Sequence, residues 1–164
     1  PWVGILGWTW LSIMNPHAYS WRLNSMPVAA TLAIAVFVGV LVTRDRKQIF
    51  ATRETKILML FMVWMCITLP FSFYFDQSAP LWSRVMKIDL MVLVAMVVLY
   101  SRKHITYFAW VLVGSLGFYG TKGGLFTLAT GGSHRVWGPT NSYIEGNNEV
   151  ALALVMIIPL MRFL

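Results

Sequence analysis

Residues 57–75, with the sequence ILMLFMVWMCITLPFSFYF, form a run of nineteen residues without a charged side chain. Because a helix needs about 20 apolar residues to cross the hydrocarbon core of a bilayer, this run predicts a membrane-spanning helix. Pro70 lies near its far end, where a kink is tolerated if a neighbouring helix satisfies the freed backbone groups. The chain has a single cysteine, Cys66, which excludes a disulfide framework and a cysteine metal cluster. We expect its thiol to be buried and inert.

The whole chain shares this apolar character. Of its 164 residues, 58% are hydrophobic and only 12% are charged, whereas about a quarter of the residues of an ordinary globular protein are charged. Since a soluble domain of this size could not cover its surface with so few charges, lipid is the expected solvent. We therefore predict an all-α fold, a polytopic transmembrane helix bundle of about five spans. The apolar segments lie near residues 2–14, 27–43, 57–75, 81–100, 105–124 and 149–164.

Residues 1–164 are expected to form one incomplete N-terminal transmembrane domain. The first apolar segment, residues 2–14, is too short to cross a bilayer unless it continues upstream. It has no basic n-region and no small-residue cleavage site, so we do not expect a signal peptide. Since the chain begins without a methionine and stops inside an apolar segment, we expect it to be a piece of a longer protein.

The basic residues predict the orientation of the chain. The net charge is +7, which in a soluble protein would suggest nucleic-acid binding. In a membrane protein, positive charges in the loops instead set the orientation of the chain. Residues 44–56 carry five positive and two negative side chains, and the positive-inside rule places them in the cytoplasm. The alternation of loops then puts the short turn at residues 76–80 and the loop at residues 125–148 on the outer side.

Two cations, Arg84 and Lys87, lie in the first turns of the 81–100 segment. They are three residues apart and share a helix face, near a helix N-terminus whose dipole favours anions. This arrangement predicts a seat for a phosphate or diphosphate at the outer leaflet. The alternative is that both side chains snorkel to lipid head groups. Asp89 points to a different face and needs an interior partner, as a counter-ion for one of the basic groups.

The 105–124 segment ends in a glycine-rich stretch. Gly120 and Gly124 form a G-x-x-x-G pair, which permits close helix approach. Lys122 lies at the outer end of this stretch and would place another positive charge near the outer head groups.

Residues 130–148 form the longest polar loop and hold the densest chemistry of the chain. Arg135 can clamp a phosphate with two parallel hydrogen bonds, and its neighbours are the titratable His134 and Trp137, whose ring suits stacking on a sugar. A loop that only connects two helices could be shorter and plainer. Alternatively, His134 is a solvated loop residue. Four polar residues near the end of the loop also fit capping of the next helix: Glu145, Asn147, Asn148 and Glu149.

The sequence contains no zinc-protease, C-x-x-C or G-x-S-x-G motif. We therefore predict no metal and no cofactor, and the residues alone do not name a reaction.

Several stretches carry a resemblance to a known family. They are residues 10–17 (WLSIMNPH), 117–126 (GFYGTKGGLF), 134–139 (HRVWGP) and 145–154 (EGNNEVALAL), together with the segment around Lys87. The chain resembles the O-antigen ligase and polymerase superfamily, and within it the O-glycosylation ligases associated with exosortase A systems. The resemblance covers essentially the whole chain but only the N-terminal half of the family.

This resemblance implies a polytopic glycosyltransferase of the bacterial inner membrane. Such an enzyme transfers a glycan from an undecaprenyl-diphosphate carrier to an acceptor at the periplasmic face, without nucleotide sugar or metal. The family pattern R-x-x-G matches Arg135 and Gly138, and its Asn-rich segment matches Asn147 and Asn148. By this likeness, Arg135 would contact the donor diphosphate.

The remaining site predictions combine the resemblance with the outer position of the cations. Diphosphate contacts are expected from Arg135, Lys87, Arg84 and Lys122, and glycan contacts or loop structure from Trp137, Asn147, Asn148 and Glu145. The family implies a C-terminal ligase domain beyond Leu164 that supplies the catalytic group, so this piece alone should be inactive. Within the chain, His134 is the one candidate for that role.

Two other functions compete with the ligase prediction. In a transporter or channel module, Arg84, Lys87, Asp89 and Glu145 would line a path through the membrane. In a noncatalytic scaffold, the basic groups would only hold anionic lipid.

Overall fold

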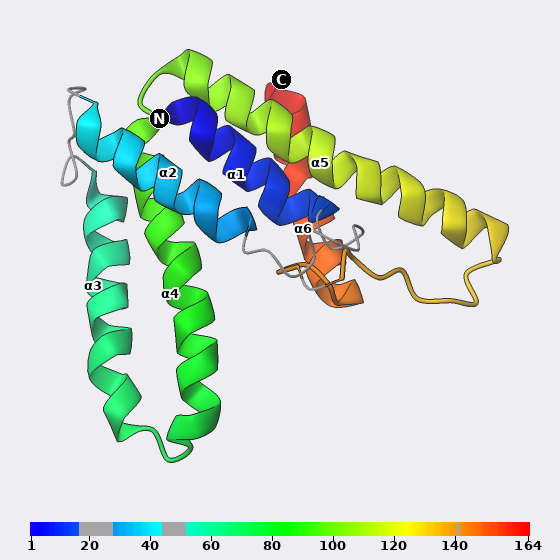
Figure 1. Cartoon of the computed structure of the whole chain (residues 1–164). Helices are drawn as coiled ribbons and strands as arrows, with labels where there is room; N and C mark the ends of the chain where they lie inside the picture. The colour runs from blue at the N-terminus through cyan, green and yellow to red at the C-terminus, as the bar shows by residue number, and fades with distance from the viewer. Residues whose placement is uncertain (17–27, 44–51, 141) are drawn as a thin grey trace. The chain divides into compact units, whose positions relative to one another are not determined.

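The computed structural model describes most of the chain (Figure 1). The described residues are 1–16, 28–43, 52–140 and 142–164. Part of the predicted cytoplasmic loop and the first residue of the predicted 27–43 segment lie outside them. The described part contains six α-helices and no strand, which confirms the predicted all-α class.

The helices follow the predicted apolar segments, and most of them are extended at one or both ends. They are α1 (Trp2–Met14), α2 (Val28–Val42), α3 (Arg53–Thr68), α4 (Phe75–Val98), α5 (Arg102–Ala129) and α6 (Asn147–Phe163), with a 3₁₀ turn η2 (Leu69–Phe71) after α3. They fall into two compact units, each described by itself below. The first unit comprises Pro1–Val38 and Ser101–Leu164, and the second comprises Gly39–Tyr100.

In the first unit, α1 lies along α5 for its whole length. At its start, the Trp2 ring stacks on His104, with 4.7 Å between centroids, and on Tyr107, with 5.8 Å. At its end, the Tyr119 hydroxyl donates a hydrogen bond to the carbonyl oxygen of Met14 (3.0 Å). The start of α1 contacts the start of α5, and the end of α1 contacts a later part of α5. The two helices therefore run parallel.

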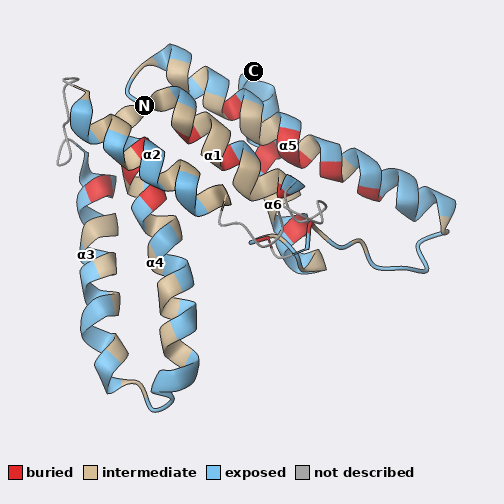
Figure 2. Ribbon diagram, in the orientation of Figure 1, coloured by how far each residue is buried: buried red, intermediate tan, exposed pale blue. Residues whose placement is uncertain are grey.

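One face of α5 is buried by these neighbours. Ala109, Leu116 and Tyr119 are buried along it, and Figure 2 shows the corresponding stripe of buried residues. Their spacing of seven and three residues is that of one helix face. The stripe therefore marks the interface of α5 with the rest of the first unit.

The glycine pair in α5 was predicted only in part. A Cβ atom at Gly120 would lie 2.9 Å from Cδ2 of Leu154 in α6, so this glycine does allow a close approach. Nothing lies within 4 Å of a Cβ atom at Gly124. The close contact expected there falls instead on Gly123, where a Cβ atom would lie 2.7 Å from Cγ1 of Val136. The glycine-rich stretch also does not end the helix, which continues to Ala129.

The second unit is a helical hairpin of α3, η2 and α4. Thr52 caps α3, since its hydroxyl oxygen accepts a hydrogen bond from the backbone N–H of Thr55 (3.3 Å). At the hairpin tip, the Ser72 and Ser78 hydroxyls are hydrogen-bonded to each other at 2.7 Å. These contacts fix both ends of α3 within the unit.

The prediction that residues 76–80 form a turn is wrong, because α4 begins at Phe75. The N–H of Ser78 donates to the carbonyl oxygen of Tyr74 (3.0 Å), so helical bonding starts before the proline. Pro80 is the sixth residue of α4 and removes only one hydrogen bond near the helix start. Asp76 is in the first turn, where a negative charge is favourable.

Apolar side chains dominate the exposed surface of the described residues. Nine hydrophobic residues are buried, whereas large hydrophobic residues are exposed on every helix. On the hairpin, Leu60 is 70% exposed and Phe73 is 100% exposed. The thiol of Cys66 is also exposed, so the prediction of a buried cysteine is wrong.

By length and composition, one helix among the described residues could cross a membrane. It is α3 with the following turn, Arg53–Phe71, which has 19 residues. The helices Trp2–Met14 and Val28–Val42 are apolar but shorter. The bundle of about five spans therefore stays a prediction.

The contact between α5 and α6 can be tested with a matched pair of substitutions, Gly120→Val and Gly124→Val. Both place the same β-branched side chain in the same helix, but only position 120 faces Leu154. Overpacking should make Gly120→Val less stable than Gly124→Val by about 1–3 kcal/mol. Thermal unfolding of the two variants in detergent micelles measures the difference, and equal midpoints would contradict this contact.

Candidate functional site

The candidate loop begins where two glycines end α5. Gly131 and Gly132 have φ angles of 60° and 77°, which favour glycine. The N–H of Gly132 donates to the carbonyl oxygen of Thr127 (2.9 Å), as in a helix C-terminal cap. The chain therefore leaves the helix through a sharp turn.

After this turn, the loop returns along the last turns of α5. The close approach of Val136 to Gly123 marks this return. The His134 ring lies 6.2 Å from the ring of Phe126 in α5, measured between centroids. Residues 134–136 are therefore held against the helix that they have just left.

The second half of the loop is a compact turn. The N–H of Gly138 donates to the carbonyl oxygen of Glu145 (2.9 Å), and the N–H of Ser142 donates to that of Pro139 (3.2 Å). A Cβ atom at Gly138 would collide with the carbonyl oxygen of Ile144. Only glycine fits at position 138, which is the glycine of the R-x-x-G pattern.

The end of α1 holds this turn in place. The side-chain amide of Asn15 donates a hydrogen bond to the carbonyl oxygen of Thr140 at 2.6 Å. Asn15 is only 5% exposed and has a φ angle of 45°. The sequence gives no sign of this bond, which joins residues 125 positions apart.

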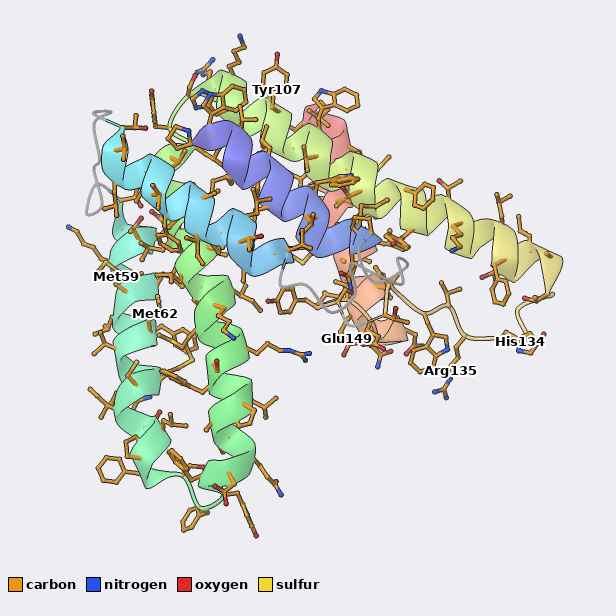
Figure 3. All side chains as sticks on the ribbon, in the orientation of Figure 1. Met59, Met62, Tyr107, His134, Arg135 and Glu149 are labelled. Carbon is orange, nitrogen blue, oxygen red and sulfur yellow. The ribbon has the colours of Figure 1, made fainter. Side chains whose placement is uncertain are left out.

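These anchors leave three adjacent functional candidates exposed. His134, Arg135 and Trp137 are all exposed, whereas Pro139 is fully buried. Figure 3 shows His134 and Arg135 on the loop, with Arg135 projecting away from the helices. The loop thus exposes a guanidinium, an imidazole and an indole within a stretch of four residues, 134–137.

The polar residues after the loop have mixed roles. Helix α6 begins two residues earlier than predicted, with Gly146 as its N-cap. A Cβ atom at Gly146 would collide with the carboxylate of Glu149, so this carboxylate lies against the helix start. The predicted capping is not seen, because the described residues show no side-chain capping hydrogen bond at the start of α6. Asn147 and Asn148 are the first two residues of α6. Glu145 is outside the helix, and its backbone accepts the bond from Gly138.

The four predicted diphosphate-binding cations divide between the two units. Lys122 and Arg135 belong to the first unit, and Arg84 and Lys87 belong to the second. All four side chains are exposed. Lys122 lies inside α5 rather than at its end.

The helix-dipole premise for Arg84 and Lys87 is wrong. They are the tenth and thirteenth residues of α4, whereas the dipole acts only within the first turn. On the same helix, the Oδ2 atom of Asp89 is buried and has no hydrogen-bond partner among the described residues. The predicted counter-ion contact of Asp89 therefore finds no support there.

The described residues contain no cluster of three or more His, Cys, Asp or Glu side chains that could hold a metal ion. The polar groups of the loop are suited to binding through hydrogen bonds and charge instead.

The chain matches a known family model over its whole length. It matches the model of a family of unknown function (DUF5935) over residues 1–164, and it therefore belongs to that family. No curated protein and no solved structure matches it.

The compact turn can be tested by Gly138→Ala. The added methyl group meets the Ile144 carbonyl oxygen, so we expect a loss of about 2–3 kcal/mol of stability. Hydrogen exchange should increase in residues 134–146. Gly114→Ala is the control, because a Cβ atom there has nothing within 4 Å, and it should leave this exchange unchanged. Unchanged exchange in Gly138→Ala would contradict the described turn.

Proposed function

We propose that this member of the DUF5935 family is the N-terminal membrane part of an O-antigen-ligase-like enzyme. The enzyme transfers a glycan from an undecaprenyl-diphosphate carrier to an acceptor at the periplasmic face of the bacterial inner membrane. The sequence resemblance supplies the reaction. The arrangement of the candidate loop supplies the physical support for a ligand site.

The proposed membrane location rests on the exposed apolar surface. Soluble monomers rarely expose contiguous apolar patches of more than a few hundred Å², whereas here exposed residues such as Leu60, Trp64 and Ile67 follow one another along α3. In lipid these side chains need no protein cover. We propose a multi-pass bundle of about five spans, with the loop between α5 and α6, residues 130–146, in the periplasm.

The observation that carries the proposal is the exposure of Arg135 on an anchored loop. A guanidinium forms two parallel charge-assisted hydrogen bonds with a phosphate, and it stays charged at any physiological pH. A diphosphate leaving group gains negative charge as the glycosidic bond breaks. A cation placed at that point stabilises the transition state more than the ground state.

The neighbours of Arg135 fit the same ligand. Trp137 is 62% exposed and offers a flat apolar face to a sugar ring. Lys122 is exposed on α5, the helix that precedes the loop. For Arg84 and Lys87, which lie in the second unit, diphosphate contact stays a prediction. A catalytic base from a further domain completes the site, so these residues alone bind without catalysing.

Substitution of Arg135 in the intact enzyme tests the proposed site. Arg135→Ala should lower kcat/KM for a carrier-linked donor about 100-fold, the typical effect of removing one transition-state donor. Arg135→Lys should retain part of the activity, because the charge remains but the two-point contact is lost. Arg102→Ala removes an exposed cation from the opposite end of α5 and serves as the control. Unchanged glycan transfer in Arg135→Ala would contradict the proposed site.

Cysteine labelling tests the proposed orientation. In a Cys66→Ser background, Ser133→Cys places a single exposed thiol beyond the C-terminal end of α5, and Lys103→Cys places one in the first turn of α5. A membrane-impermeant maleimide should label Cys at position 133 from the periplasmic side, and position 103 only after the membrane is permeabilised. The reverse pattern, or equal labelling without permeabilisation, would contradict the proposed topology.

A further inference from the structure

We infer that Asn15 and Tyr119 are positioning residues that hold the candidate loop so that Arg135 meets its ligand. This inference rests on the proposed function for the role of Arg135. It adds two side chains outside the loop, one at the end of α1 and one within α5.

Asn15 both ends α1 and holds the loop. Its amide reaches the carbonyl oxygen of Thr140 at 2.6 Å from a side chain that is only 5% exposed. The left-handed backbone at Asn15, with φ 45°, directs the chain out of α1, and its own N–H donates to the carbonyl oxygen of Leu11. Asparagine tolerates this backbone region better than most residues. One residue therefore ends the helix and binds the loop.

Tyr119 sets the position of the C-terminal end of α1 along α5. Its hydroxyl binds the carbonyl oxygen of Met14, the residue before Asn15. Tyr119 is buried, and Gly123, which receives Val136, lies four residues further along α5. Residues four apart lie on the same helix face. One face of α5 thus receives both the end of α1 and the returning loop.

Arg135 lies directly before the first anchor and close to the second. Val136 is the next residue in the chain, and Thr140 follows four residues after that. The bond between Gly138 and Glu145 closes the turn that contains Thr140. Val136 and Thr140 are held by two buried residues, Gly123 and Asn15, whereas Arg135 itself is exposed. The backbone is therefore restrained while the guanidinium can meet a ligand.

The restraint has a functional consequence. A loop that is already ordered loses less conformational entropy when it binds. Displacement of a binding group by about 1 Å can cost as much as 100-fold in rate. Release of the Thr140 anchor should therefore weaken donor binding although no contact residue has changed.

Three substitutions in the full chain test this inference. Asn15→Gly keeps access to positive φ but removes the amide, Asn15→Asp replaces the donor with a carboxylate that repels the Thr140 carbonyl oxygen, and Tyr119→Phe removes only the hydroxyl. The controls make the same chemical changes at exposed positions, Gln77→Glu in α4 and Tyr107→Phe in α5.

The first measurement is the rate of trypsin cleavage after Arg135, which does not depend on any activity. Loss of one part-buried hydrogen bond should increase this rate about tenfold in the three test variants and not in the controls. Unchanged cleavage in Asn15→Gly and Tyr119→Phe would overturn the anchoring itself.

The second measurement separates positioning from general stability in the intact enzyme. The KM for the carrier-linked donor should rise about tenfold, while the KM for the acceptor stays unchanged. Simple destabilisation would lower the amount of active enzyme and would move neither KM. Faster cleavage with an unchanged donor KM would overturn the positioning role. Failure of the proposed function would be recognised separately, as full transfer activity in Arg135→Ala.

Discussion

The first unit depends on one face of α5, which packs closely against α1, α6 and the candidate loop. Within five residues of this helix, Tyr119 binds the end of α1, Gly120 faces α6 and Gly123 receives the loop. If the surroundings are lipid, helices gain little from hiding apolar surface from one another, since lipid tails are equally apolar. Close packing at small residues and hydrogen bonds between helices then hold the unit together. These are the interactions that α5 supplies.

The local parts of the fold could be predicted from the sequence. An apolar run that ends at Asn15 is enough to place α1 at residues 2–14, because helix formation there depends on neighbours in the chain. The start of α4 was missed for a reason that is also local. The sequence predicted a turn that ends at Pro80, but the N–H of Ser78 already donates to the carbonyl oxygen of Tyr74. The bond between Ser72 and Ser78 closes the hairpin before this proline.

The contacts that shape the candidate site could be predicted only in part. The chemistry of Arg135 and Trp137 is visible in the sequence, because a polar loop with two glycines must expose its charged groups. The bond between Asn15 and Thr140 joins residues 125 positions apart, and no local pattern specifies it. The same holds for the difference between Gly123 and Gly124, since spacing alone cannot say which of two adjacent glycines faces a neighbour.

The structure changes the relative weight of the predicted cations. Arg84 and Lys87 were favoured by a helix N-terminus that lies nine and twelve residues before them, so the dipole no longer contributes. On long, flexible side chains along a helix surface, they can equally well extend to lipid head groups. Arg135 differs because the residues that follow it are held in place, Val136 against Gly123 and the next residues in the turn closed between Gly138 and Glu145. A cation on a restrained backbone can favour one ligand geometry over others, which a freely moving cation cannot do. The proposed recognition of a diphosphate is therefore better assigned to Arg135 than to the two cations of α4.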